Sequence, residues 1–237
     1  SSSNIISALS EIDNIDIVRT QDSPYILYIE GEDDQRILAA WARTLGKSEL
    51  FQKYYPYILG GSSKKEMKDK ADRHYGALKQ IVPKLKRAML FDFDNEEVAL
   101  NPDSDNIVLN EWKRKNIDNY LLVPDAWKRA VSKELREPAD SLFVQPYFEI
   151  IDKVFSDQNL FLPKSSSWKN IKAQIFNIID GKKLLYENKD SLFTQLKNAG
   201  KQTVIINRTS VASNMLLDNI HEDVYNFFDN LEKITNQ

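Results

Sequence analysis

The sequence predicts an α/β fold in which a parallel sheet is flanked by helices, with an additional mostly helical C-terminal subdomain. Short runs of β-forming residues alternate with helix-length amphipathic segments up to about residue 119, and afterwards the strand pattern nearly stops. Glycine and proline are also scarce, at seven and eight of 237 residues, which favours a helix-rich chain.

The N-terminal half supplies the predicted sheet. Tyr25 to Ile29 is continuously apolar, as expected of a strand buried on both faces, and the helix after it turns Ile37, Leu38 and Trp41 inward. Further strands are predicted at 54–59, 87–94 and 107–109, and a helix at 64–81. This alternation is typical of a right-handed parallel layer.

Helical spacing dominates the C-terminal half. Helices are predicted at 126–136, 141–155, 168–179, 182–197, 210–220 and 224–234, whereas 204–206 is ambiguous. We therefore divide the chain into an N-terminal linker segment (1–24), an α/β core (25–124) and a helical subdomain (125–237). Because the chain begins without Met, we expect it to be part of a longer protein.

Composition excludes several classes of site. The chain has no cysteine and only two histidines, His74 and His221, which we expect at the surface or the edge of the core. A metal must therefore be held by oxygen, which favours Mg²⁺, Mn²⁺ or Ca²⁺. The net charge of −3 argues against nucleic-acid binding over the whole surface. No apolar run reaches membrane-spanning length, so we expect a cytoplasmic protein.

Acidic residues follow two of the predicted strands. Glu30 ends the first strand, Asp92 and Asp94 end the third, and Asp34 lies about one helical turn beyond Glu30. Ligands of open parallel sheets bind beyond the carboxyl ends of the strands. Converging carboxylates repel one another unless cations neutralise them, so the pattern predicts one or two Mg²⁺ or Mn²⁺ ions, or Ca²⁺. The alternative is a helix cap or solvated loop acid, which we favour for Glu32 and Asp33.

Four motifs carry a resemblance to a known family. Residues 28–34 (YIEGEDD) resemble the hydrophobic-Glu-Gly-x-x-Asp signature of Toprim domains, and 90–94 (LFDFD) resemble their Asp-x-Asp signature. Residues 114–121 (RKNIDNYL) resemble the Arg-x-x-Ile-Glu-Asn-Tyr-Leu segment of OLD (overcoming lysogenization defect) family nucleases, with Asp118 where that family usually has Glu. Residues 181–185 (GKKLL) resemble the family's Gly-Lys-hydrophobic motif.

The resemblance implies a divalent-metal-dependent DNA endonuclease, the catalytic region of an OLD-type protein whose N-terminal ATPase domain this chain lacks. The predicted partners are DNA, that ATPase domain and a second copy in a homodimer. Glu30 would bind metal and relay a proton, and Asp118 would complete a second metal site. Lys182 would stabilise the transition state and Arg114 would position the phosphate. The alternatives for these two are a surface lysine opening a helix and a solvated helix end.

Basic residues predict a DNA surface beside the acids. Between residues 64 and 87 nine basic residues stand against three acidic ones, and a second basic run covers 113–115. The alternative is a solvated helix face. Residues 60–63 (GGSS) either aim N–H groups at a phosphate or form a bare turn, and they lack P-loop spacing. The predicted DNA contacts are Lys64, Lys65, Lys68, Lys113 and Lys115.

Three other functions remain open. The Asp92–Asp94 pair also resembles the Asp-x-Asp of haloacid-dehalogenase phosphatases, although that family expects Thr or Val where Glu96 stands. A Toprim protein of another branch, such as a primase or topoisomerase fragment, would share the acids. A non-enzymatic binding module could keep them for a structural cation.

Overall fold

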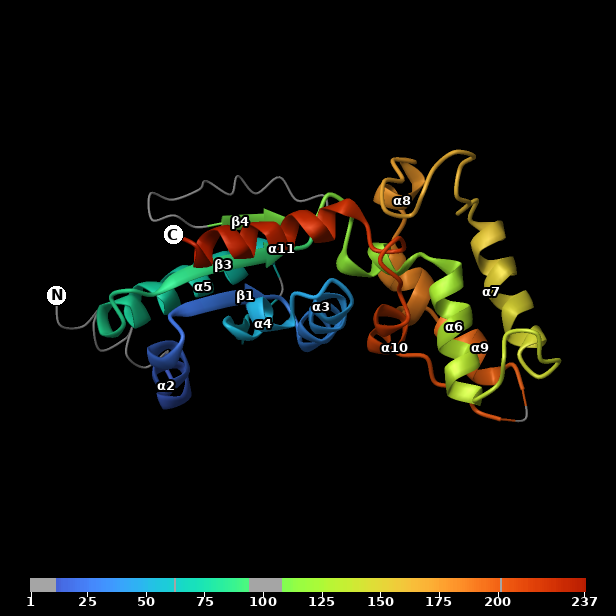
Figure 1. The fold of residues 1–237 in the computed structure, drawn as a ribbon, viewed down its shortest axis with the longest axis horizontal. Coiled ribbons are helices and arrows are strands. Elements are labelled where there is room, and N and C mark those ends of the chain that lie inside the picture. The colour runs from blue at the N-terminus through green and yellow to red at the C-terminus, as the bar shows by residue number, and fades with distance from the viewer. Residues whose placement is uncertain (1–11, 62, 94–107, 201) are drawn as a thin grey trace.

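A computed structural model describes residues 12–61, 63–93, 108–200 and 202–237. In these ranges a parallel sheet has the strand order β2-β1-β3-β4 (Figure 1). The strands are β1 (Tyr25–Ile29), β2 (Tyr55–Ile58), β3 (Lys86–Phe91) and β4 (Val108–Glu111), each parallel to its neighbours. The predicted parallel α/β class is confirmed, and each predicted strand is found within three residues of its expected ends.

Both faces of the sheet are covered, which explains the continuous apolar sequence of β1. Leu27 and Ile29 face one core with α3 (Glu32–Thr44), α4 (Ser48–Gln52) and the C-terminal helix. Ile26 and Tyr28 face a second core with α5 (Lys64–Ile81). All four side chains are fully buried, as expected for a strand in the middle of a parallel sheet.

The segment predicted as a linker contains a helix, α2 (Asn14–Asp22), which packs beside α5 and β2. Asp16 lies 3.0 Å from Nε2 of His74 and accepts a hydrogen bond from the Tyr55 hydroxyl. The Tyr28 hydroxyl lies 2.9 Å from Nδ1 of the same histidine. His74, expected at the surface or the edge of the core, is fully buried, and this polar network satisfies its ring.

The helices between residues 124 and 213, called the helical group below, are shorter and more interrupted than predicted. α6 (Pro124–Leu135) and α7 (Gln145–Asp157) match expectation, but the predicted helix at 182–197 splits into η2 (Lys183–Glu187), one π-helical turn, and α9 (Leu192–Asn198). Ser191 starts α9 by accepting a hydrogen bond from the Thr194 N–H. The helices expected at 168–179 and 210–220 shorten to α8 (Ile175–Ile178) and α10 (Arg208–Ser213). Residues 204–206 have no regular secondary structure.

The last helix, α11 (Glu222–Thr235), lies along the sheet rather than with the helical group (Figure 1). The Tyr54 hydroxyl donates to the Leu231 carbonyl at 2.7 Å, and Nδ2 of Asn230 donates to Asn110 at 2.9 Å. The predicted helical subdomain (125–237) is thus not one continuous stretch, since its final helix completes the cover of the sheet.

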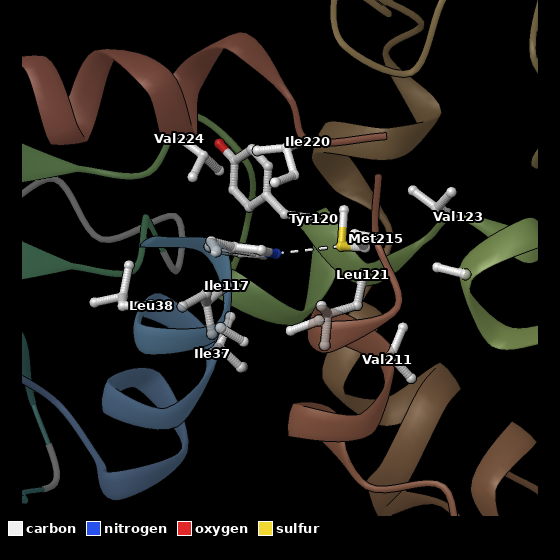
Figure 2. Packing of buried hydrophobic residues seen from close by; sticks show 14 of the residues in the cluster. Ile37, Leu38, Ile117, Tyr120, Leu121, Val123, Val211, Met215, Ile220 and Val224 are labelled. Carbon is white, nitrogen blue, oxygen red and sulfur yellow. Dashed lines mark hydrogen bonds between the residues drawn. The ribbon is translucent and has the colours of Figure 1, made fainter. Parts of the chain in front are cut away.

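A single core joins the sheet layer to the helical group. Nε1 of Trp41, on α3, donates a hydrogen bond to the sulfur of Met215 at 3.2 Å (Figure 2). Met215 follows α10 in the chain. Figure 2 shows Ile37 in the same cluster as Val211 and Met215, so residues of the sheet layer and of the helices after residue 124 share one apolar interior. Within the described residues no helix combines the length and apolarity that a bilayer crossing requires.

Asp223, at the start of α11, is held by three partners. The Tyr120 hydroxyl donates to Oδ2 at 2.8 Å, Lys113 Nζ lies 2.9 Å from Oδ1, and His221 Nδ1 lies 3.2 Å from Oδ2. Burial raises the pKa of Asp223, but hydrogen bonds from His221, Lys113 and Tyr120 outweigh it, so the pKa falls below the usual range.

Replacing Asp223 with Asn is expected to lower the free energy of unfolding by about 2–3 kcal/mol at pH 7. The depressed pKa means that the carboxylate stabilises the fold above its unfolded pKa of about 3.9, and that this contribution is lost as pH falls further. Urea unfolding should therefore give a difference in free energy of unfolding between the wild type and Asp223→Asn that is larger at pH 7 than at pH 3. A difference that does not depend on pH would contradict the stabilising role of the Asp223 carboxylate.

Candidate active site

A cavity of about 470 Å³ opens at the carboxyl edge of the sheet. The chain runs from β1 outward to β2 and then returns to β3 on the other side of β1. The crevice beyond β1 and β3 is therefore the switch point of the sheet, where ligands of open α/β folds bind. Among the described residues, seven acidic and three basic side chains line it, including Glu30, Asp34, Asp92, Asp118, Lys182 and Arg208.

Glu30 and Asp92 meet across this switch point. Glu30 follows β1 and Asp92 follows β3, and the Asp92 N–H donates to Oε1 of Glu30 at 3.2 Å. Oδ1 of Asp92 in turn accepts the Ile117 N–H at 3.0 Å, which attaches the next acidic segment to the end of β3. The structure thus brings together two acids that lie 62 residues apart in the sequence.

Asp34 lies on the first turn of α3 and combines two interpretations that the sequence left as alternatives. Its Oδ2 accepts the Gly31 N–H at 3.1 Å, so it caps the helix while also lining the cavity. Burial and the neighbouring Glu30 charge raise the pKa of Asp34 to about 7. Glu32 and Asp33, expected as helix caps or solvated acids, are exposed and form ion pairs, Glu32 with Arg36 at 3.0 Å and Asp33 with Arg208 at 3.3 Å.

Asp118 reaches the cavity from η1 (Ile117–Leu121), a short 3-10 helix. Burial raises the pKa of Asp118, and this effect is opposed by Arg208, whose Nε lies 2.6 Å from Oδ1. The segment containing the family-like motif therefore does place its acid beside Glu30 and Asp92.

Lys182 lines the same cavity and is half exposed. Burial lowers its pKa, but the charges of Glu187, Asp118 and Asp92 outweigh that effect and raise it. The preceding Gly181 N–H donates to Oδ1 of Asn119 at 3.0 Å, which holds the start of η2 against η1. A Cβ on Gly181 would lie 2.6 Å from that oxygen, so glycine is required for this close approach.

Arg114 is placed differently from the prediction. Its side chain is buried, Nη1 donates to the Asn119 carbonyl at 2.8 Å, and the guanidinium lies over the rings of Tyr120 and Phe176. It does not line the cavity. Arg114 therefore stabilises the η1 segment in this structure rather than facing the site where a phosphate would bind.

The predicted DNA-contacting lysines are mostly engaged with acids. Lys68 lies 2.7 Å from Asp72, Lys113 lies 2.9 Å from Asp223, and Lys115 lies 3.0 Å from Asp180. Lys64 does not fit the prediction of a DNA contact, because its side chain is only 2% exposed. Its Nζ contacts Glu111 at 2.8 Å and the Phe93 carbonyl at 2.9 Å. Lys65 is exposed and pairs with no acid in the described ranges.

The neighbouring lysines 64 and 65 give a matched test of this difference. Lys64→Met is expected to lower the free energy of unfolding by about 3 kcal/mol, because it leaves the Glu111 carboxylate and the Phe93 carbonyl without their donor. Lys65→Met removes the same charge from an exposed position and should change stability by less than about 0.5 kcal/mol. Urea unfolding at pH 7 measures both, and equal losses would contradict the buried placement of Lys64.

Asp94 lies outside the described residues. Within the ranges that are described, no three His, Asp or Glu side chains are grouped closely enough to hold a metal ion as they stand. Gly60 and Gly61 also line the cavity, and both have positive φ, at 55° and 142°. The two glycines of the predicted turn are thus beside the acids, and Ser63 caps α5 by accepting the Glu66 N–H.

Sequence reasoning missed Arg208 and Glu187, which complete the cavity wall. Arg208 lies 90 residues from its partner Asp118, and no local pattern distinguishes it from the other arginines of the chain. Comparisons of the chain with protein-family models, with curated proteins and with solved structures found no match.

Proposed function

We propose that this protein is a divalent-metal-dependent DNA endonuclease. The observation that carries the proposal is the cavity at the sheet switch point, where the carboxylates of Glu30, Asp34, Asp92 and Asp118 lie with the cation of Lys182. Phosphodiester hydrolysis needs negative ligands for cations together with positive groups that bind phosphate oxygens. The side chains that line this cavity include both the negative ligands and the positive group.

The donor chemistry suits Mg²⁺ or Mn²⁺, and Ca²⁺ shares the same preference for oxygen. The cavity lining supplies carboxylates and no histidine. Burial and the neighbouring Glu30 charge raise the pKa of Asp34 by disfavouring its ionised form, and a bound divalent cation would favour that form again. Glu30, Asp34, Asp92 and Asp118 would hold one or two ions. Such an ion lowers the pKa of a bound water and stabilises charge on a phosphate.

The remaining steps fall to the side chains of the chain. Glu30 accepts the proton of the attacking water, since its carboxylate faces the same cavity as Asp92. Lys182 is kept charged by its acidic neighbours and donates to the leaving oxygen. Lys65 contributes to binding of the DNA backbone away from the reacting phosphate, because it is exposed and basic.

The wider proposal is that the chain acts as the catalytic region of an OLD-type nuclease, with DNA and an N-terminal ATPase domain as partners. It is supported by the meeting of separate motifs. Residues of all four motif segments line one cavity. They are Glu30 and Asp34 of the first segment, Asp92 of the second, Asp118 of the third and Lys182 of the fourth.

The deciding experiment incubates supercoiled plasmid with the protein and Mg²⁺, Mn²⁺ or Ca²⁺, against an EDTA control. We expect nicked or linear plasmid with Mg²⁺ or Mn²⁺ and intact plasmid with EDTA. A parallel assay with p-nitrophenyl phosphate tests the phosphatase alternative. Turnover of that ester with intact plasmid would replace the nuclease proposal by a phosphatase, and inactivity in both assays would favour a binding module.

A further inference from the structure

Arg208 reaches the cavity from α10 in the helical group and is fixed by three contacts. Its Nε lies 2.6 Å from Oδ1 of Asp118, and its Nη1 lies 3.3 Å from Oδ2 of Asp33 on α3. The guanidinium carbon lies 4.2 Å from the ring centroid of Tyr186 on η2. With 17% of its side chain exposed, Arg208 has little freedom to move.

These contacts determine the orientation of Asp118. Its side chain is 3% exposed, and Arg208 engages one carboxylate oxygen, Oδ1. Among the described residues no donor hydrogen-bonds to the second oxygen, Oδ2, although the residue lines the cavity. Carboxylates that bind metals are commonly held by an outer hydrogen-bond partner in this way, and loss of that partner typically weakens metal binding by about 10- to 100-fold.

We propose that Arg208 is a positioning residue that orients the Asp118 carboxylate toward a divalent cation in the cavity. The inference rests on the proposed function and adds to it a residue supplied by the helical group. A lysine is not an adequate substitute, because the planar guanidinium provides two donors in a fixed geometry, one for each of its two acidic partners.

The direction in which cation affinity changes when Arg208 is replaced distinguishes a positioning role from a purely electrostatic one. Removing a positive charge beside a cation site strengthens cation binding by Coulomb's law alone. Removing a positioning residue weakens it, because Asp118 is released from its orientation. Arg208→Gln and Arg208→Lys are therefore compared with Arg129→Gln, which removes an arginine that bonds Asn214 and Asn219 outside the cavity.

The probe is Mn²⁺ alone, titrated into each protein while free Mn²⁺ is measured by electron paramagnetic resonance. We expect both Arg208 variants to bind Mn²⁺ at least tenfold more weakly than the wild type, and Arg129→Gln to bind it within twofold of the wild type. Unchanged or tighter binding by Arg208→Lys and Arg208→Gln would overturn the inference. Circular dichroism at the assay temperature confirms that each variant compared is folded, and Arg208→Lys preserves the charge in case Arg208→Gln unfolds.

Plasmid cleavage provides a second readout that a merely structural role would not produce. At saturating Mn²⁺ the rate of Arg208→Lys should return to within about threefold of the wild type, because mass action compensates for weaker binding. A wild type that binds Mn²⁺ without cleaving DNA would reject the nuclease and leave the positioning role standing. A wild type that cleaves DNA while both Arg208 variants keep full Mn²⁺ affinity would reject the positioning role alone.

Discussion

Replacing Asp92 with Asn is expected to lower the rate of plasmid cleavage in Mg²⁺ by at least about 100-fold, equivalent to about 2.7 kcal/mol of transition-state stabilisation. The amide oxygen of Asn can still accept the Ile117 N–H that Oδ1 of Asp92 accepts at 3.0 Å. The fold is thus retained while the negative charge at the switch point is lost. The rate of nicking of supercoiled plasmid, followed on agarose gels, measures the effect.

Asp152 supplies the matched control for this substitution. It lies on α7, is 60% exposed, and pairs with Lys128 rather than lining the cavity. Asp152→Asn should therefore cleave plasmid at the wild-type rate. If Asp92→Asn also cleaved at that rate while remaining folded, the cavity could not be the nuclease site.

The second large effect concerns stability. Asn119 is fully buried, accepts the Gly181 N–H, and donates from Nδ2 to the carbonyls of Phe176 and Ile179, both at 2.8 Å. Asn119→Ala leaves these three backbone groups without their partner, and two of them, the Phe176 carbonyl and the Gly181 N–H, lie in buried hydrogen bonds. Because each unsatisfied buried group costs about 1–3 kcal/mol, the free energy of unfolding should fall by about 3–4 kcal/mol.

Urea unfolding at pH 7 measures this loss, and Asn170 offers the comparison. Asn170 is exposed and accepts only from Ser167, so Asn170→Ala should cost less than about 1 kcal/mol. Gly181→Ala should destabilise in the same direction as Asn119→Ala, because its Cβ would approach Oδ1 of Asn119 to 2.6 Å. Similar stabilities for Asn119→Ala and Asn170→Ala would show that the η1–η2 contact contributes little.

The sheet could be predicted from sequence because its signal is local. The apolar run 25–29 and the acids that follow it are adjacent in the chain, and the parallel arrangement places the ends of β1 and β3 side by side. The convergence of Glu30 and Asp92 required only that rule. The lengths of α8 and α10 were overestimated, because helical spacing of apolar residues also occurs in irregular segments that pack on a shared core.

The charged residues show why the rest could not be predicted. Lys64 and Lys65 are indistinguishable in sequence, yet one is buried because Glu111, 47 residues away, happens to face it. Arg114 was predicted to position a phosphate and instead contacts two aromatic rings, one of which, Phe176, comes from a distant segment. Such partners are set by tertiary packing, which neither charge runs nor motif spacing encodes.

Because α11 returns to the sheet, the chain connects the helical group to the sheet layer at two points. The chain leaves the sheet layer after β4 and re-enters it at α11, so the helices between are tethered at both ends. Together with the apolar core that these helices share with the sheet layer, the two attachments hold Lys182 in place beside the acids at the strand ends.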